Sequence, residues 1–297
     1  MIASWVAAAV LIAQATIPHP VVGTATVPGS PPRVGAPEKR IVGVEELGPV
    51  LTAASAIAVD VESGAVLFGK QPHAVRPLAS ITKLLAVLAI LQRSSEPGEL
   101  VGIVAEDIPP EGGTRLLVGD RVTIQELLSL SLVASDNAAI AALARTHGGT
   151  VATVAKMQDL AREYGLHSVR VRDVSGLDPW TVGSATDAAT LLMRAAEAPG
   201  IAQRMTLSEI TVDPHRIPPE PLRALATNVL LRDGFRHAFA IRGGKTGYLD
   251  EAGSNLAIIV ERDGHRVAVV VLGSASRDDR FRDARVLADW VFRNYEW

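Results

Sequence analysis

The sequence predicts an α+β fold, in which an antiparallel sheet is flanked by helices and an all-helical subdomain is inserted between the strands. Two hairpin patterns lie toward opposite ends of the chain, at residues 55–70 and 255–273. The segment between them, roughly 94–235, is dominated by helical apolar spacing. An amphipathic pattern at 278–295 closes the chain, and we expect that helix to lie on the sheet.

The N-terminal region is expected to lie outside this fold. Residues 1–15 form an apolar run that is short for a bilayer span but suits a signal peptide, with cleavage after Ala15. No Lys or Arg precedes the run, so an uncleaved anchor or a misassigned start is the alternative. Residues 16–41 contain six prolines among small residues, a composition typical of an extended tether. The folded domain is expected to span 42–297.

Composition excludes several classes of protein. A net charge of -3 provides no basic surface for nucleic acid, and the absence of cysteine removes thiol chemistry and disulfides. The seven histidines show no paired metal-ligand spacing, and no G-x-S-x-G motif of a Ser-His-Asp hydrolase occurs. We therefore expect neither a metal nor a cofactor.

The strand predictions depend on turn chemistry. Ser63-Gly64 divides the first hairpin, and Asp263-Gly264, a strong tight-turn signal, divides the second. Residues 237–244 are expected to add a neighbouring strand to the same antiparallel sheet.

The helix predictions depend on capping and on apolar spacing. Thr123 and Glu126 form a T-x-x-E capping box before an apolar segment. Either Ser184 or Thr186 is expected to cap a later helix. Helical spacing is found over the segments 76–91, 127–135, 137–147, 151–165 and 184–197.

Ser80 and Lys83 form an S-x-x-K motif at the head of the first helix. Side chains three residues apart share a helix face, so the hydroxyl and the amine can meet. Residues 84–91 are apolar on nearly all sides, which predicts burial and a lowered pKa for Lys83. A neutral amine can act as a base for Ser80, whose place in the first helical turn favours a developing negative charge. The alternative is a chance motif with Lys83 extending to solvent.

Two further motifs carry polar groups. Ser135, Asp136 and Asn137 lie between two predicted helices, where they can face a cleft or simply cap the second helix. Lys245, Thr246 and Gly247 follow the end of a predicted strand and two glycines, so a peptide could dock alongside. A phosphate loop is rejected, because Phe239 stands where that pattern needs glycine.

Together, S-x-x-K, S-D-N and K-T-G in this order are typical of penicillin-binding proteins and class A β-lactamases. The chain resembles the D-alanyl-D-alanine carboxypeptidase family of low-molecular-weight penicillin-binding proteins from about Ile57 to its C-terminus. Segments that carry the resemblance include "LLVGDRVTIQELLSLSLVASDNAAIAALA", "MQDLAREYGLHSVRVRDVSGLD" and "GGKTGYLDEAG". The resemblance implies a β-lactamase/transpeptidase-like fold.

The resemblance also implies a role for each motif residue. Ser80 would be acylated by a terminal D-Ala-D-Ala peptide, with Lys83 accepting its proton. Ser135 would bridge the two lysines and relay a proton to the leaving amine. Asn137 and Lys245 would complete the catalytic set, Asn137 by holding the substrate amide and Lys245 by keeping the cleft electrostatically positive. Thr246 would bind the terminal carboxylate, and Gly247 and Tyr248 would also bind substrate. The backbone N–H groups of Ser80 and Tyr248 would form the oxyanion hole.

The resemblance implies an exported bacterial enzyme, located in the periplasm or on the outer face of the cytoplasmic membrane. Its partners would be peptidoglycan stem peptides, with β-lactam antibiotics as inhibitors, and it would contact the membrane only through an uncleaved N-terminal segment. Carboxypeptidase and endopeptidase activities stay open.

Two other functions are considered. A class A-like β-lactamase needs a glutamate that activates water, and "EYGLH" from Glu163 to His167 faintly resembles its motif, although a solvent-facing helix-end glutamate is favoured. A catalytically idle sensor of peptidoglycan or β-lactam would not need the full set of motif residues.

Overall fold

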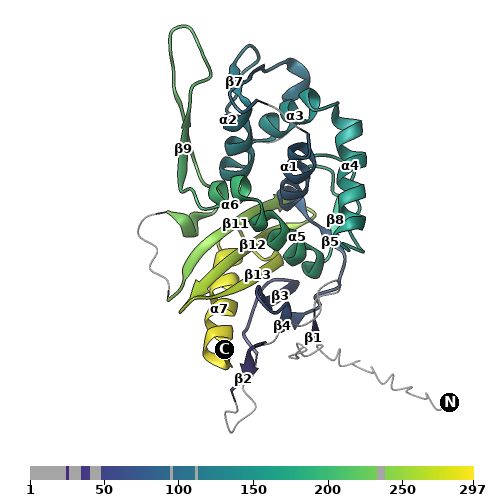
Figure 1. The fold of residues 1–297 in the computed structure, drawn as a ribbon, viewed down its shortest axis with the longest axis vertical. Coiled ribbons are helices and arrows are strands. Elements are labelled where there is room, and N and C mark those ends of the chain that lie inside the picture. Colours follow the sequence, from purple (N-terminus) through teal and green to yellow (C-terminus); the bar gives the residue numbers. More distant parts are fainter. Residues whose placement is uncertain (1–24, 27–34, 41–47, 94–95, 111–112, 233–237) are drawn as a thin grey trace, which may run out of the picture.

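The computed structural model describes residues 25–26, 35–40, 48–93, 96–110, 113–232 and 238–297 (Figure 1). The predicted signal peptide and most of the predicted tether lie outside these ranges. Two short pieces of the tether are paired with the domain: β1 (Ala25–Thr26) lies beside β4 (Ala65–Lys70), and β2 (Glu38–Lys39) lies beside β14 (Tyr295–Glu296). In the described ranges, no helix is both long and apolar enough to span a membrane.

A six-stranded antiparallel sheet forms the centre of the fold, in the order β1-β4-β3-β13-β12-β11. Its long strands are β3 (Ser55–Asp60), β4, β11 (Ala240–Leu249), β12 (Gly253–Arg262) and β13 (His265–Ser274). Both predicted hairpins are confirmed. Asp263 and Gly264 have φ of 52° and 86°, and a two-residue turn with both φ values positive matches the twist of the strands it joins.

One strand differs from its prediction. The third strand was expected over 237–244, ending before Lys245, but β11 begins at Ala240 and continues through the K-T-G motif to Leu249. His237 lies outside the described residues. A register shift between Ile241 and Gly243, where Gly243 has φ of 147°, marks a bulge that the strand passes through without ending.

Helices cover both faces of the sheet (Figure 1). Helix α7 (Asp279–Asn294) packs on one face, and α5 (Ala185–Glu197) and α6 (Pro199–Met205) pack on the other. Each face of the sheet packs against its own hydrophobic core, and the strand side chains alternate between these two cores. Ile57 faces the core that includes α5, and Ala58 faces the core that includes α7. Ser184 is the residue that caps α5, in a capping box with Asp187.

The inserted region is mainly helical, with α2 (Ile124–Ser129), a π-helical turn (Leu130–Ala134), α3 (Asn137–Thr146) and α4 (Thr150–Glu163). It is not purely helical as predicted. Short antiparallel strands pair within it as β6 (Leu100–Gly102) with β7 (Arg121–Thr123), and β9 (Glu209–Val212) with β10 (Leu222–Leu225). Further short elements are β5 (Arg76–Pro77), β8 (Val182–Gly183) and the 3-10 turns Ala105–Asp107 and Val229–Leu231.

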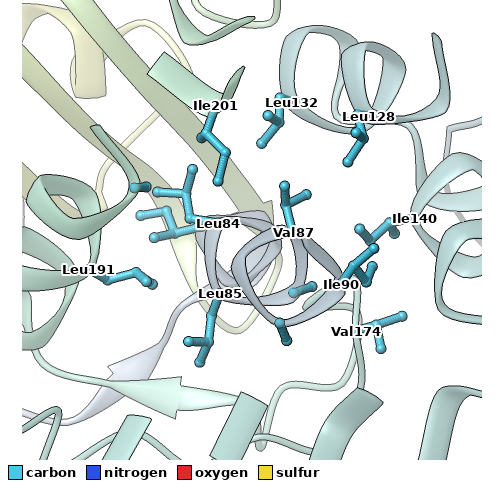
Figure 2. Packing of buried hydrophobic residues seen from close by; sticks show 14 of the residues in the cluster. Leu84, Leu85, Val87, Ile90, Leu128, Leu132, Ile140, Val174, Leu191 and Ile201 are labelled. Carbon is cyan, nitrogen blue, oxygen red and sulfur yellow. The ribbon is translucent and has the colours of Figure 1, made fainter. Parts of the chain in front are cut away.

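Helix α1 (Lys83–Leu91) runs through the middle of the main core. Figure 2 shows Leu84, Leu85, Val87 and Ile90 pointing outward from α1 in different directions, toward side chains of the surrounding elements. Seven of its nine residues are buried, as the apolar sequence predicts. The core therefore fixes the axis of α1 and, with it, the residues at its N-terminal end.

Candidate active site

Ser80 lies in a 3-10 turn, η1 (Ala79–Thr82), that leads directly into α1. The sequence predicted the first turn of an α-helix at this position. A 3-10 turn has three residues per turn, so positions 80 and 83 eclipse each other and the meeting of the two side chains is retained. The Nζ of Lys83 lies 2.8 Å from Ser80 Oγ. Ala79 has φ of 49°, a strained value for a residue with a Cβ.

Lys83 is fully buried, and its amine lies among four polar atoms. Besides Ser80 Oγ, Nζ lies 2.6 Å from Asn137 Oδ1, 3.2 Å from the carbonyl oxygen of Ser175 and 3.4 Å from Ser135 Oγ. Burial lowers the pKa of Lys83 to about 7, because an ammonium loses its hydration there. The amine is therefore available in its neutral form near neutral pH.

Two carboxylates limit this shift. Asp136 and Asp173 both raise the pKa of Lys83, although by less than burial lowers it. Asp136 caps α3 by accepting a hydrogen bond from Ala139 N–H. Asp173 organises the following loop by accepting from the N–H and hydroxyl of Ser175, whose carbonyl faces Lys83.

Ser135 lies between the two lysines. It ends the π-helical turn in a left-handed conformation, with φ of 59°, directly before the cap of α3. The Nζ of Lys245 donates to Ser135 Oγ at 2.7 Å and to the carbonyl of Thr246 at 3.0 Å. Burial first, then the charges of Lys83 and Arg280, hold the pKa of Lys245 well below its usual value. A state with one neutral amine is thus favoured over two adjacent ammonium groups.

Strand β11 contributes one wall of the site through the residues from Thr246 to Leu249. Thr246 Oγ1 donates to Thr227 Oγ1 at 2.7 Å. Gly247 lies against the 3-10 turn, since a Cβ there would stand 2.9 Å from the Leu78 carbonyl oxygen and 3.2 Å from Ser80 N. Only glycine allows this close approach.

An open cavity of about 890 Å³ joins these groups. Ser80, Ser135, Asn137, Thr246, Gly247 and Tyr248 all line it, together with Pro110, Gly113, Ala134, Leu177, Pro179, Thr227, Leu249, Asp250, Glu251, Arg277 and Arg280. Tyr248 stands at the rim, 41% exposed, where its hydroxyl donates to Asp250 and Arg277 lies 4.3 Å from its ring.

All eight predicted site residues therefore meet in one place, although they come from three distant parts of the chain. Six of them line the cavity, and the two lysines lie directly beneath it and bond to Ser135. Glu163, the residue considered for a lactamase, is exposed at the end of α4 and does not line the cavity.

Several site residues were not predicted. Thr227 supports Thr246, and Arg280 donates from Nη1 to the Gly247 carbonyl at 3.0 Å. Burial, followed by the charge of Arg277, lowers the pKa of Arg280 to about 10, so it stays charged at neutral pH. Arg280 lies in the closing segment "DDRFRDARVLADW", which also carries the resemblance, whereas no local pattern in the sequence singles out Thr227.

The hydroxyl of Ser80 contacts the buried amine of Lys83, and the hydroxyl of Ser135 and the amine of Lys245 lie beside them. This arrangement suits acyl transfer through the serine, with the lysine as its base. Across the described ranges, no group of three or more His, Asp or Glu side chains is arranged to bind a metal ion.

Comparison with known proteins specifies this class further. The model of peptidase family S11, described as D-alanyl-D-alanine carboxypeptidase, matches residues 43–276, and the chain belongs to this family as a serine-type DD-peptidase.

Curated relatives agree with this assignment, and a solved structure shares the fold. A D-alanyl-D-alanine endopeptidase of Pseudomonas aeruginosa is 31% identical over 91% of this chain and 84% of its own length. The carboxypeptidase DacB2 of Mycobacterium tuberculosis is 31% identical over 80% of this chain and 81% of its own length. The fold is similar to that of the Streptomyces K15 DD-transpeptidase, with a TM-score of 0.76, 23% identity, and 83% and 99% of the two chains covered.

Proposed function

We propose that this chain hydrolyses the D-Ala-D-Ala end or the D-alanyl cross-link of peptidoglycan stem peptides through an acyl-enzyme on Ser80. The observation that carries the proposal is the 2.8 Å contact between Ser80 Oγ and the buried amine of Lys83, whose pKa is about 7. Relatives named as endopeptidases and as carboxypeptidases support both versions of the substrate.

The acylation step uses Lys83 as the base. Neutral Lys83 takes the proton of Ser80 as Oγ attacks the carbonyl carbon of the penultimate D-alanine, and the carbonyl oxygen becomes an oxyanion. The backbone N–H groups of Ser80 and Tyr248 stabilise that oxyanion. The close packing of Gly247 against the Ser80 turn supports this arrangement, because it brings β11 beside the nucleophile.

Departure of the amine requires a proton. Ser135 Oγ lies 3.4 Å from Lys83 Nζ and 2.7 Å from Lys245 Nζ, so a proton from Lys83 can pass through this hydroxyl to the leaving nitrogen. Water then attacks the ester carbonyl, Lys83 again serves as base, and Ser80 is regenerated with release of the shortened peptide.

Substrate binding is assigned to the cavity walls. Asn137, whose Oδ1 contacts Lys83, presents its amide nitrogen toward the substrate backbone. Thr246, with Lys245 beneath it, binds the carboxylate end, while Gly247 and Tyr248 on β11 pair with the extended peptide. We assign the enzyme to the periplasm or the outer face of the cytoplasmic membrane, where its substrate lies, and β-lactams would inhibit it by acylating Ser80.

Product analysis tests the proposal. Wild-type protein and Ser80→Ala are each incubated with a peptide ending in D-Ala-D-Ala and with a cross-linked stem-peptide dimer. We expect D-alanine from the first substrate, monomers from the second, or both, and no turnover by Ser80→Ala. Binding of either substrate without turnover by the wild-type protein would instead indicate an idle sensor.

A further inference from the structure

Asn255 is fully buried in the central sheet, yet its side chain reaches the segment that precedes Ser80. It belongs to β12 and pairs with Gly247 of β11. Its Nδ2 donates to the carbonyl oxygens of Pro77 and Leu78, at 3.0 and 3.2 Å. Its Oδ1 accepts from the N–H of Gly273 at 2.8 Å. The amide thus joins two strands of the sheet to the nucleophile segment, and every polar atom of the side chain is used.

A β-bulge makes this reach possible. Between β12 and β13 the register shifts, since Ser254 pairs with Ser274 but Leu256 pairs with Val271. The extra residue lies in β13, where Gly273 has φ of 68°. The backbone N–H of Gly273 donates a hydrogen bond to Asn255 Oδ1. Bulges of this kind are frequent next to active sites, where they redirect a side chain.

The segment held by Asn255 contains a strained residue. Pro77 and Leu78 directly precede Ala79, whose φ of 49° costs free energy for any residue with a Cβ. The Leu78 carbonyl also accepts from Ile81 N–H at 3.3 Å, inside the 3-10 turn. Such a conformation persists only when its surroundings fix it, and rotation of the Leu78–Ala79 peptide would move both the N–H and the Oγ of Ser80.

We propose that Asn255 is a positioning residue for the nucleophile. By fixing the carbonyls of Pro77 and Leu78, it holds Ala79 in its left-handed conformation and aims the hydroxyl and N–H of Ser80 into the cavity. The inference rests on the proposed function, in which Ser80 is acylated. Asn255 itself lies behind the turn and touches no substrate.

The test separates the rate of acylation from the binding that precedes it. The rate of labelling by a fluorescent penicillin is measured at increasing concentrations, which yields the dissociation constant of the non-covalent complex and the maximal acylation rate. For Asn255→Ala we expect the maximal rate to fall about 100-fold, while the dissociation constant changes by less than about threefold, because the cavity walls are intact and only the nucleophile is misplaced.

Asn294→Ala is the matched control. Asn294 is also buried, and its Nδ2 donates to a backbone carbonyl, that of Trp290 at 2.8 Å, but it lies at the end of α7. Both alanine variants are expected to melt at a lower temperature than the wild type. Only Asn255→Ala is expected to lose acylation rate, so the ratio of rate loss to melting-temperature loss distinguishes positioning from general stability.

Clear results would overturn the inference. A folded Asn255→Ala with an acylation rate within about threefold of the wild type does so, as does an equal rate loss in Asn294→Ala. If Asn255→Ala does not fold, the isosteric Asn255→Asp, which keeps an oxygen toward Gly273 but removes the donor, is judged by the same criteria. Failure of the wild-type protein to be labelled at Ser80 would refute the proposed function instead.

Discussion

The acylation rate is predicted to depend on the protonation of Lys83, and pH is the direct perturbation. Only the neutral amine can accept the Ser80 proton. The pKa of Lys83 is lowered from 10.5 to about 7, so raising the pH through about 7 increases the fraction of active enzyme. The penicillin carboxylate stays ionised over this range, so the change in rate reports the enzyme.

The magnitude follows from this pKa. At pH 7, a lysine with an unperturbed pKa of 10.5 would be neutral in about one molecule in 3,000, whereas Lys83 is neutral in about half. Burial therefore increases the concentration of the base about 1,500-fold at this pH. Below pH 7, the rate should fall about tenfold per pH unit, to about one hundredth of its plateau at pH 5.

The assay measures the second-order rate constant for labelling of Ser80 by a fluorescent penicillin between pH 5 and pH 9, at constant ionic strength. We expect a single rise with a midpoint near 7 and a plateau above about pH 8. A rate that is constant across this range would refute the role of Lys83 as the base. A labelling rate that still increases tenfold per pH unit at pH 9 would show that Lys83 has the pKa of an exposed lysine.

Three further predictions concern stability and the lactamase alternative. The folded-state pKa of Lys83 lies below its unfolded value, so above pH 7 the unfolded chain binds one more proton than the folded protein. The free energy of unfolding of the wild type should therefore rise by about 1.4 kcal/mol per pH unit relative to that of Lys83→Met from about pH 7.5 to 9.5. Urea-unfolding free energies that change equally with pH in the two proteins would contradict this. Gly176→Ala should lose about 3 kcal/mol or more in the same assay, since φ is 79° and a Cβ would lie 2.0 Å from the Ala79 carbonyl oxygen, whereas Gly98→Ala, where a Cβ meets nothing, should lose little. Glu163→Gln should leave the lifetime of the penicilloyl-enzyme unchanged within about twofold, measured as loss of bound label over time, and a large increase in that lifetime would support a lactamase.

Much of the fold was predictable because local chemistry determined it. The turn at Asp263-Gly264 needs two residues that tolerate positive φ, and the capping box of Thr123 and Glu126 satisfies free N–H groups at a helix start; both are present as predicted. The burial of Lys83 was also predictable, since a helix that is apolar on all sides leaves its first residue little access to water.

The remainder depended on contacts between distant segments. Strands of three or four residues, such as β6 and β9, are too short for their periodicity to be recognised. The bulges in β11 and β13 shift the alternation of side chains, which concealed both the length of β11 and the role of Asn255. Thr227 lies 19 residues from its partner Thr246, and no local pattern indicates that their hydroxyls meet.

Mass spectrometry of the protein after penicillin treatment tests the central claim most directly. Opening of the β-lactam ring releases nothing, so acylation adds the full mass of the antibiotic. We predict a single adduct that peptide mapping places on Ser80, that is absent from Ser80→Ala, and that forms far more slowly in Lys83→Met. An adduct on another residue, or wild-type protein that stays unmodified and leaves the penicillin intact, would contradict the assignment of Ser80 and Lys83 as nucleophile and base.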